Sequence, residues 1–396
     1  MRGKSLKALH VMNDFPYPPN HGGRVDIWGR LQCLLELGFD VHAVVTLKMR
    51  PSDIEISHVR KMVSRLDLID RSPNWKGIIS SFPVQVASRS GLANIRLTDH
   101  YRLVLAESEF SFPIFENSTL NADVKVLRIH NDESRFMSEL AGVERNFLKR
   151  MYYREESKRF STFSPKAFAA VDQLWFSSAD QYRDYAMLHS DHNRKAAWLP
   201  PPVDLHAFVP PTTKTCRQVL FVGGLSVLSN IEAIDWYMSG VHPKLKHIDD
   251  YRFVIAGNTR GLPVSPIIQK AATDACCTLF TNVADLSHLY EQSAVFINCM
   301  VRGASIKMKT INAAEKGLPI VSTTVGNEGT GFINGQHICI ADTHEAFVTS
   351  IDNLLSSPSE GLEMAERAQS FLCSRYRHAE QIKSLFGMEK GEAALQ

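Results

Sequence analysis

The chain has 396 residues, with 44 lysines and arginines against 42 aspartates and glutamates, which leaves a formal net charge of +2. This length suits two domains, each with its own core. The near-neutral charge excludes a dedicated nucleic-acid binder, and the 44% hydrophobic and 22% charged residues exclude a disordered or coiled-coil chain.

Seven cysteines are scattered along the chain, and no two have the Cys-x-x-Cys spacing of a metal or redox site. We therefore expect reduced, buried thiols in a cytoplasmic protein. No run of about 18 apolar residues predicts a membrane-spanning helix. Polar residues interrupt the N-terminal apolar stretch, which indicates a first buried strand and not a signal peptide.

Short apolar runs alternate with longer helical patterns in the first half of the chain. Residues 6–12 and 41–47 are predicted strands, and residues 22–37 between them form a predicted helix with one apolar face. This strand–helix–strand order is typical of a parallel sheet. The half continues with predicted strands over 102–106, 124–129 and 174–177, a helical tract over about 133–170 and a helix from about 178.

Three consecutive prolines, Pro200–Pro202, mark the best candidate linker, because proline fits neither a helix interior nor a central strand. The alternation then restarts. Strands are predicted over 218–222, 253–256, 278–281, 295–298, 319–323 and 337–340, and helices over 230–245, 308–315 and from 345 onward. We expect an N-terminal domain over residues 1–205, a C-terminal domain over 206–375, and a final helix and tail over 376–396.

Two successive α/β halves predict two doubly wound, Rossmann-like domains that face one another across a cleft. In open α/β sheets, ligands bind at the carboxyl ends of the strands, where helix N-termini point at them. The loops that follow the strands are therefore the places to look for a site.

Glycine pairs follow the first strand of each half. Gly22 and Gly23 begin the first predicted helix, where they would let backbone N–H groups approach a ligand, and Arg24 adds a positive charge. Gly224 belongs to a similar pair. The alternative is an ordinary proline-rich loop, since neither a Walker loop nor a Gly-x-Gly-x-x-Gly fingerprint is present.

A basic cluster opens the predicted helix 308–315. Arg302, Lys307 and Lys309 lie around its N-terminus, and Ser305 lies among them. Cations at a helix N-terminus oppose the macrodipole, so an anion such as a diphosphate would resolve the conflict. The alternative is that these side chains simply point into solvent.

Two other strand ends carry candidate residues. His130 follows the strand 124–129 and could contact a substrate, the alternative being a hydrogen-bonded loop histidine. Gly326 and Glu328 follow the strand 319–323, where backbone amides could meet the ligand of the basic cluster. The chain has no nucleophile elbow and no His or carboxylate pair at metal-ligand spacing, so we expect chemistry without a metal.

Residues 303–329 resemble the donor-binding signature of GT-B glycosyltransferases of family 4, with a lysine, an Ala-x-x-Gly-x-Pro segment and Gly-x-Glu-Gly at similar spacing. Other segments resemble the family in the same order: residues 15–24, 130–133, 199–208 and 221–233. The likeness spans most of the chain.

The resemblance implies an acceptor-binding first domain and a second domain that binds a nucleotide-diphosphate-sugar, with the last helix crossing back to the first domain. It also implies sugar transfer with retention of anomeric configuration and with no metal or other cofactor. By position, Lys309 matches the lysine at the donor phosphates, Gly22 and Gly23 match the backbone loop near the diphosphate, and His130 matches the histidine near the transferred sugar.

The chain departs from the family pattern at two positions. The glutamate that binds the ribose falls on Asn312, and the partner found eight positions earlier in some members falls on Ala304. Asparagine can still accept a hydrogen bond from a ribose hydroxyl, but it adds no charge.

These observations predict a retaining, metal-independent glycosyltransferase of polysaccharide or glycolipid assembly, acting on a glycan or lipid-linked acceptor. The alternatives are a non-catalytic GT-B subunit that binds a nucleotide-sugar or a partner enzyme, and a sugar-nucleotide epimerase of the same fold. We expect His130, Lys309 and Arg302 to be catalytic, and the donor to be bound by Gly22, Gly23, Arg24, Gly224, Ser305, Lys307, Asn312, Gly326 and Glu328.

One stretch raises the question of a membrane. Residues 145–166 hold seven basic and two acidic residues, interleaved with aromatic and large apolar side chains. Such a helix could rest on an anionic membrane and reach a lipid-linked acceptor, which would place the protein at the inner face of the membrane. The alternative is a solvated face with its apolar side in the core.

Overall fold

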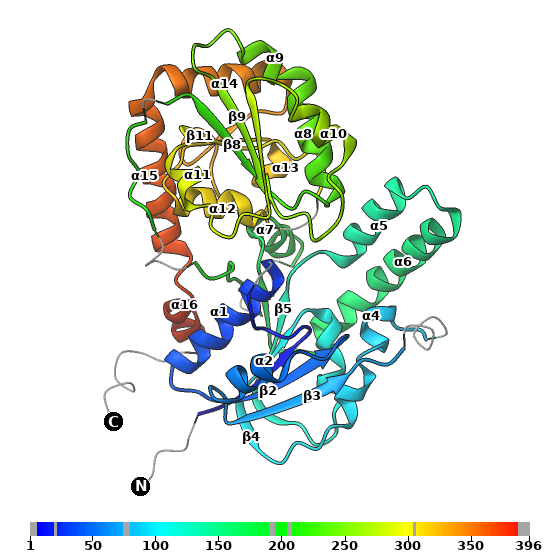
Figure 1. The fold of residues 1–396 in the computed structure, drawn as a ribbon. Coiled ribbons are helices and arrows are strands. Elements are labelled where there is room, and N and C mark those ends of the chain that lie inside the picture. Colours follow the sequence, from blue (N-terminus) through cyan, green and yellow to red (C-terminus); the bar gives the residue numbers. More distant parts are fainter. Residues whose placement is uncertain are drawn as a thin grey trace. The chain divides into compact units, whose positions relative to one another are not determined.

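The computed structural model describes residues 6–19, 22–73, 80–189, 195–203, 208–214, 216–303 and 306–386. The chain divides into two compact units, one formed by Met1–Pro202 with Arg377–Gln396 and the other by Val203–Tyr376. Each unit contains one parallel β-sheet with helices around it, which confirms the predicted fold class (Figure 1). The domain boundary predicted at residue 205 lies outside the described residues.

The first unit is built on a sheet with the strand order β3-β2-β1-β4-β5-β6-β7, in which all neighbouring pairs are parallel. Its strands are β1 (Lys7–Met12), β2 (Asp40–Leu47), β3 (Arg65–Asp70), β4 (His100–Glu107), β5 (Asn121–Ile129), β6 (Gln173–Phe176) and β7 (Ala196–Trp198).

Helices cover both faces of this sheet. Along β1, Ala8 and Met12 pack in one hydrophobic core, whereas Leu9 and Val11 pack in another. Because successive side chains of a strand point to opposite faces, the two cores lie on the two sides of the sheet. The helical segments of this unit are α1 (Gly22–Glu36), α2 (Asp53–Arg60), α4 (Val84–Ala87), η1 (Ser90–Asn94), η2 (Glu109–Glu116), α5 (Glu133–Val143), α6 (Phe147–Ala169), α7 (Ala179–Leu188) and α16 (His378–Leu385).

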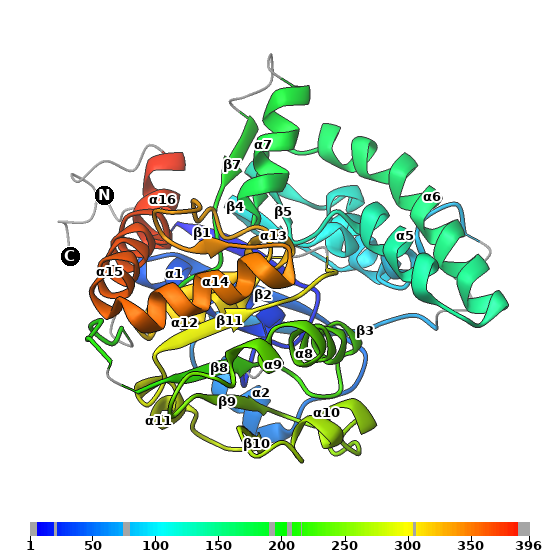
Figure 2. The same cartoon turned by 90° about the horizontal axis from the view of Figure 1, so that it is seen from above.

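The helical tract predicted over 133–170 is two helices. The chain leaves α5 at Glu144, and Asn146 caps α6 by accepting a hydrogen bond from the backbone N–H of Lys149. Figures 1 and 2 show α5 and α6 side by side as a hairpin that extends away from the sheet. The sequence carried a usable signal for this break, because asparagine is unfavourable inside a helix and is among the preferred N-cap residues.

The sequence pattern also missed β3 and α2. β3 is an edge strand that is partly buried along most of its length, so charged residues interrupt its apolar run. α2 carried a usable signal, since Ser52 and Glu55 form a capping box at its start.

The second unit repeats the architecture with the strand order β10-β9-β8-β11-β12-β13, again parallel throughout. The strands are β8 (Gln218–Val222), β9 (Arg252–Gly257), β10 (Cys277–Thr281), β11 (Val295–Asn298), β12 (Ile320–Ser322) and β13 (Cys339–Ile340). The helices are α8 (Leu228–Gly240), α9 (His242–Leu245), α10 (Pro266–Ala271), α11 (Ser287–Glu291), α12 (Met308–Glu315), α13 (Thr324–Asn327), α14 (His344–Ser356) and α15 (Pro358–Arg375).

The last described helix, α16, packs on α1 in the first unit, although α15 before it belongs to the second. Ile382 contributes to the core under α1, and His378 hydrogen-bonds through Nε2 to the carbonyl oxygen of Pro200. Burial lowers the pKa of His378 to about 3, and the nearby guanidinium groups of Arg30 and Arg128 act in the same direction. The imidazole is therefore neutral in the folded protein.

None of the helices in the described part of the chain combines the length and the hydropathy that crossing a membrane requires.

The buried neutral His378 predicts a pH-dependent loss of stability. Its folded pKa lies below the ordinary value, so between these two values the unfolded chain binds more protons and stability falls as pH falls. From pH 7.5 to pH 5, the unfolding free energy of His378→Gln is expected to rise relative to wild type by up to about 2 kcal/mol, because glutamine does not titrate. Urea unfolding at both pH values measures this difference. His247→Gln, at an exposed position, is the matched control, and parallel behaviour of wild type and His378→Gln would contradict the assignment.

Candidate functional site

In the second sheet, the strand order reverses direction between β8 and β11. The loops that leave the carboxyl ends of two such strands run to opposite sides of the sheet and leave room for a ligand between them. The predicted residue Gly224 follows β8, and Arg302, Lys307 and Lys309 follow β11. The topology thus places these four residues around one switch point.

Gly223 and Gly224 bring the backbone after β8 close to two helices. A Cβ atom on Gly223 would lie 2.9 Å from Asn230 Nδ2 and 3.1 Å from Lys309 Nζ. The Nδ2 group of Asn230 also donates a hydrogen bond to the carbonyl oxygen of Gly224 at 2.9 Å. A side chain at Gly223 would therefore displace the side chains of Asn230 and Lys309.

The ammonium group of Lys309 lies beside this glycine pair. It lies in the first turn of α12, donates a hydrogen bond to Asn230 Oδ1, and places Nζ 4.7 Å from the centre of the Phe221 ring. No carboxylate of the described residues forms an ion pair with it. Burial lowers the pKa of Lys309 to about 8, and the charge of Lys307 acts in the same direction. An anion at this position would pair with a half-buried cation that no carboxylate of the described residues pairs with.

Lys307 and Glu328 are joined to one another. Lys307 Nζ lies 3.1 Å from Glu328 Oε2, and the Lys307 backbone N–H donates to the Glu328 carbonyl oxygen at 3.2 Å. The two side chains are 4% and 15% exposed. This pair connects the start of α12 to the loop after β12, so the two predicted donor residues stabilise each other's loops.

Gly326, within α13, packs closely against Asn298 at the end of β11. Its carbonyl oxygen accepts hydrogen bonds from Asn298 Nδ2 at 2.8 Å and from Thr310 Oγ1 at 2.7 Å. A Cβ atom there would lie 2.2 Å from the carbonyl oxygen of Asn298. Glycine is needed at this position because no side chain would fit.

The other predicted residues of this unit are more peripheral. Arg302 is exposed and lies 3.9 Å from a carboxylate oxygen of Glu232. Asn312 is exposed on α12. Ser305 and Ala304 lie outside the described residues.

The first unit holds a network of buried charges at its own switch point, between β1 and β4. Asp26, on α1, lies 2.6 Å from Arg30 and 3.2 Å from Arg128. Glu107, at the end of β4, lies 2.6 Å from Arg30 and 2.8 Å from His10. The network therefore joins β1, β4, β5 and α1.

His130 closes this network. Its Nδ1 lies 3.2 Å from Asp26 Oδ2, and its Nε2 lies 3.0 Å from Glu107 Oε2. The side chain is 18% exposed, whereas both carboxylates are almost fully buried. Both ring nitrogens thus face carboxylate oxygens of the network. A ligand would therefore contact His130 through the carbon atoms of its ring.

The pKa shifts show that the carboxylates of this network are ionised. Burial alone would raise the pKa of Asp26, but Arg128 and Arg30 outweigh it and lower that pKa below the ordinary value. Burial of Glu107 is likewise outweighed, by Arg30 and by hydrogen bonds from His10 and His130, and its pKa lies well below the ordinary value. Burial and the neighbouring Arg30 lower the pKa of Arg128 to about 10, which keeps it charged at neutral pH.

Asp26, Glu107 and His130 offer ligand atoms within 4.8 Å of one another, a spacing that could hold a metal ion. Each carboxylate already accepts hydrogen bonds from a guanidinium group. A divalent cation at this position would face both Arg30 and Arg128. The donor set fits a charge-compensated network and does not fit a metal centre.

Gly22, Gly23 and Arg24 begin α1. Gly23 is exposed, and Arg24 pairs with Asp14 at 3.1 Å. These residues and His130 belong to the first unit, whereas the residues around Lys309 belong to the second. The predicted site residues therefore form two groups, one in each unit.

Sequence reasoning missed Asn230, Asp26, Glu107 and both buried arginines as members of these groups. Asn230 lies in the segment 221–233 that resembles the family, but the sequence analysis assigned it no function. Glu107 and Arg128 each stand in or next to an apolar run, which is an unusual place for a charge and was a usable signal. Asp26 and Arg30, four residues apart on α1, could have been recognised as a pair on one helix face.

Comparison with known families identifies a match in the second half of the chain. The sequence profile of the family described as "Glycosyl transferases group 1" matches residues 216–357. A relative from Klebsiella pneumoniae, described as an uncharacterized 44.6 kDa protein in the cps region, is 33% identical over 395 residues, covering 96% of this chain and 99% of the relative.

Solved structures share the fold over nearly the whole chain. A glycosyltransferase from Rickettsia africae has a TM-score of 0.66 at 14% identity, covering 98% of this chain and all of that one. A point mutant of S. aureus TarM, in complex with fondaparinux, α-GlcNAc-glycerol and UDP, has a TM-score of 0.65 at 11% identity, covering 96% of this chain and 99% of that one. Anabaena HepE, in complex with UDP and glucose, has a TM-score of 0.60 at 11% identity, covering 97% of this chain and all of that one. These likenesses show the GT-B fold.

The buried network of the first unit predicts that replacing one of its carboxylates strongly lowers the unfolding free energy. Asp26→Asn is expected to lower the unfolding free energy by about 3 to 5 kcal/mol, because it leaves buried guanidinium charge uncompensated. Asp123→Asn, which breaks exposed pairs with His100 and Arg102, is expected to cost less than about 1 kcal/mol. Urea unfolding measures both, and equal effects would show that the network does not stabilise this unit.

Proposed function

Because this chain belongs to the group 1 glycosyl transferases, we propose that it moves a sugar from a nucleoside-diphosphate-sugar to a hydroxyl group of a glycan or lipid-linked acceptor, with retention of anomeric configuration and without a metal ion. It is a glycosyltransferase of the GT-B fold. We further propose a role in polysaccharide biosynthesis, which the position of its Klebsiella relative in a cps region supports.

The observation that carries the proposal is the half-buried ammonium group of Lys309, which pairs with no carboxylate of the described residues. It lies at the start of α12, and its Nζ comes within 3.1 Å of the position that a Cβ atom on Gly223 would take. A diphosphate is the kind of anion that a buried lysine and a helix N-terminus bind together. In the proposed complex, Asn230 holds the Lys309 side chain in place through the hydrogen bond at Oδ1.

The reaction would break the bond between the anomeric carbon and a phosphate oxygen, and form one from that carbon to the acceptor oxygen on the same face of the sugar. The acceptor proton would pass to the departing phosphate oxygen. Negative charge grows on the diphosphate as the bond breaks, so a fixed cation beside it lowers the barrier. Lys309 and the start of α12 would supply this stabilisation in place of a metal.

The remaining predicted residues have different roles in this proposal. Arg302 is exposed and could reach a bound donor, whereas Lys307 and Glu328 shape the loops around it through their ion pair. Asn312 would meet the ribose, and Ser305 the phosphates. Gly22, Gly23, Arg24 and the ring edge of His130 would act at the donor only if the first unit also contacts it.

Lys309→Ala tests the proposal. Transfer is expected to fall by about 100-fold, because a charge that stabilises the leaving group is lost. Lys270→Ala, which removes an exposed lysine of α10, is the control. Release of nucleoside diphosphate and the anomeric configuration of the product are measured by NMR, after a thermal-shift screen with UDP, GDP, ADP, TDP and CMP, each with and without magnesium, has chosen the donor.

Transfer by Lys309→Ala within about two-fold of wild type would remove Lys309 from the mechanism. If none of the five nucleotides raises the melting temperature of the wild type, a non-catalytic subunit is favoured. A rise in melting temperature that requires magnesium would contradict metal independence. A free epimerised sugar, released without an acceptor, would favour the epimerase alternative.

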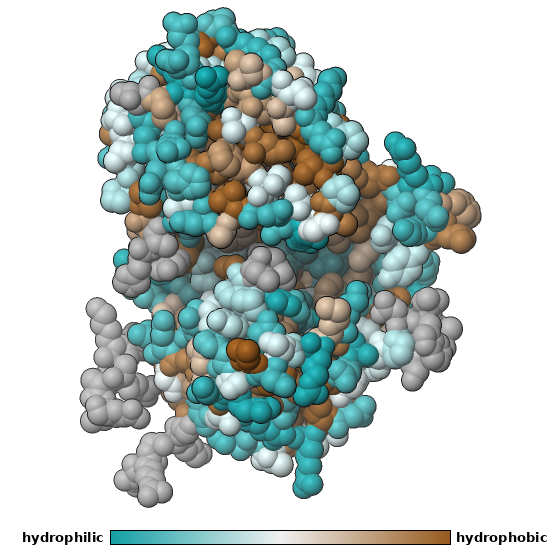
Figure 3. Space-filling model, viewed as in Figure 1, coloured by the Kyte–Doolittle hydropathy of each residue, from teal (hydrophilic) through white to brown (hydrophobic). Residues whose placement is uncertain are grey.

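We also propose that the tip of the α5–α6 hairpin contacts an anionic membrane that carries the acceptor. Phe147, Leu148 and Met151 are 60%, 75% and 52% exposed, next to the basic residues Lys149 and Arg150. Figure 3 shows apolar side chains gathered at the far end of this hairpin. Exposed apolar side chains beside basic ones suit the interface of an anionic bilayer.

Within the stretch 145–166, only the beginning suits this role. Phe160 and Phe163, further along α6, are buried in the core of the first unit. The later turns of α6 therefore pack their apolar side into the core, which was the alternative to a membrane contact. The membrane proposal concerns only the first two turns.

The triple variant Phe147→Ser, Leu148→Ser, Met151→Ser is expected to bind anionic phospholipid vesicles at least about tenfold more weakly than wild type, because it removes three apolar side chains from the interface. The double variant Met49→Ser, Ile54→Ser changes two apolar side chains that are each 82% exposed elsewhere in the first unit, and is expected to bind as wild type does. Vesicle co-sedimentation measures both. Unchanged binding of the triple variant, or no binding by wild type, would contradict the contact.

A further inference from the structure

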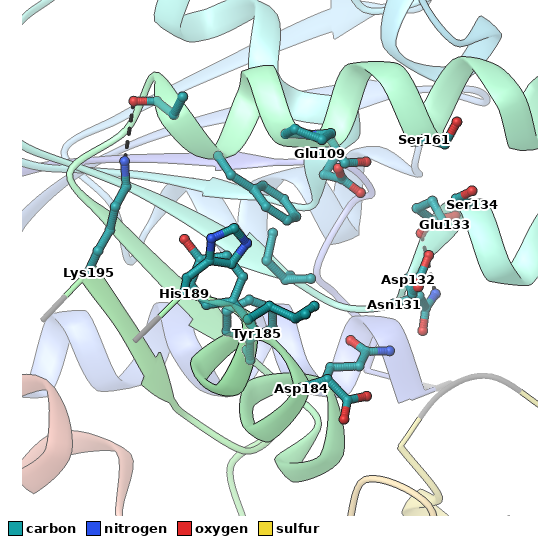
Figure 4. Close-up of a pocket in the computed structure, with 18 residues that line it drawn as sticks. Glu109, Asn131, Asp132, Glu133, Ser134, Ser161, Asp184, Tyr185, His189 and Lys195 are labelled. Atoms are coloured by element: carbon teal, nitrogen blue, oxygen red, sulfur yellow. Dashed lines mark hydrogen bonds between the residues drawn. The ribbon is translucent and has the colours of Figure 1, made fainter. Parts of the chain in front are cut away.

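The first unit contains a pocket that the proposed donor site does not use. It has a volume of about 650 Å³ and lies where β5 and β6 end, between α5, α6 and α7 (Figure 4). We call it the Glu109 pocket, after the buried carboxyl group among its lining residues. Asn131 lines it, and the next residue back along the chain is His130, so the same strand end supplies both the pocket and the predicted catalytic histidine.

Two buried oxygen atoms of this pocket have no hydrogen-bond partner among the described residues, namely Oε1 of Glu109 and Oε1 of Gln181. Glu109 is 3% exposed, so water does not readily replace the missing partner. A buried polar atom without a partner costs stability, and a ligand in the pocket would supply the missing hydrogen bonds.

The carboxyl groups of Glu109 and Glu133 are suited to hydroxyl ligands. Burial raises the pKa of Glu109 to about 8 and that of Glu133 to about 7. Each therefore carries a proton much of the time at neutral pH, and a protonated carboxyl group both donates and accepts hydrogen bonds. A sugar hydroxyl, which also does both, is the matching partner. Ser134, Ser161 and Ser164 add hydroxyl groups to the same lining.

An aromatic wall completes the pocket. The Phe176 and Tyr185 rings lie 5.2 Å apart, and Phe168 lies 6.1 Å from Tyr185. Figure 4 shows Tyr185 and His189 on one side, and Glu133, Ser134 and Ser161 on the other. A pocket with an apolar wall and convergent hydroxyl and carboxyl groups suits a sugar ring, whose C–H faces are apolar and whose edge carries hydroxyls.

The charges around the pocket disfavour anions. Asp132 and Asp184 line it as exposed carboxylates. Lys195, the lysine of the lining, donates a hydrogen bond to the carbonyl oxygen of Ala169 at 3.2 Å. A phosphate or a uronate would meet more negative than positive charge, whereas an uncharged sugar would not.

From this geometry we infer that the Glu109 pocket binds an uncharged sugar ring of the acceptor, an assignment that rests on the proposed transfer to a glycan. The lining residues of the pocket belong to the first unit, whereas Lys309 belongs to the second.

Saturation-transfer difference NMR with methyl glycosides of glucose, galactose and N-acetylglucosamine tests this assignment. With the full-length wild type, at least one of these glycosides is expected to give a saturation-transfer difference signal. The signals of glucose 6-phosphate and glucuronic acid are expected to be at least about fivefold weaker. Stronger signals from the two anions, or no signal from any methyl glycoside, would overturn it.

Two neighbouring residues of α6 offer a matched pair of variants. The hydroxyl groups of Ser161 and Thr162 are exposed and both donate to the carbonyl oxygen of Lys158, but of these two residues Ser161 lines the pocket. Ser161→Trp is expected to abolish the glycoside signal by filling the pocket, and Thr162→Trp to preserve it. Equal signals from the two would overturn the assignment.

A second pair tests the carboxyl group itself. Glu109→Leu is expected to weaken the glycoside signal at least about threefold, because leucine removes both the hydrogen-bond donor and the acceptors of the carboxyl group. Glu156→Leu changes another buried glutamate of the first unit, one that does not line the Glu109 pocket, and is expected to bind the glycoside as wild type does. An unchanged signal in Glu109→Leu would remove Glu109 from the site.

The same samples separate this assignment from the proposed function. Their melting temperatures with the nucleotide chosen for wild type report the donor site alone and are expected to shift equally in all four variants. Loss of that shift in wild type would overturn the donor proposal and leave glycoside binding to be judged by its own signals.

Discussion

Two buried carboxylates, Asp26 and Glu107, organise the first unit. Arg30 bridges them, Arg128 and His130 bind Asp26, and His10 and His130 bind Glu107. Neither carboxylate could remain ionised in this interior without the guanidinium groups, because desolvation opposes the charged form. The network therefore fixes the positions of β1, β4, β5 and α1 relative to one another. It also reaches the last helix, since Arg128 donates to the Leu199 carbonyl oxygen and His378 hydrogen-bonds to that of Pro200.

The two units treat buried charge in opposite ways. In the first unit, each buried carboxylate of the network has cationic partners within that unit. In the second unit, Lys309 has an amide and an aromatic ring but no carboxylate among the described residues. The first arrangement stabilises a fold, whereas the second suits the anionic donor that we propose. The same contrast distinguishes His130, whose nitrogens are both occupied, from Glu109, whose Oε1 is not.

Local signals in the sequence were sufficient for most of the architecture. The apolar runs of β8 and β11 are short and uninterrupted, because strands buried on both faces favour apolar residues throughout. In β1 and β2 the runs are interrupted by the buried residues His10, His42 and Thr46. The edge strand β3 escaped detection because its partial exposure admits charged residues. The α5–α6 break escaped detection although Asn146 is a preferred N-cap residue. Among the site residues, Lys309 was identifiable from its place at a predicted helix start, but Asn230, which holds it, lies 79 residues earlier in the chain.

The sequence by itself determined that the chain has two α/β halves, that the glycine pairs and the basic cluster follow strands, and that the second half resembles a donor-binding domain. These properties depend on neighbours along the chain, where residue type and spacing are enough. Only the tertiary structure decided which charges meet. Asp26 and Arg128 are 102 residues apart, and the Glu109 pocket draws its lining from segments between residues 109 and 195. Such contacts depend on strand order and helix packing, and one sequence carries no local pattern for either.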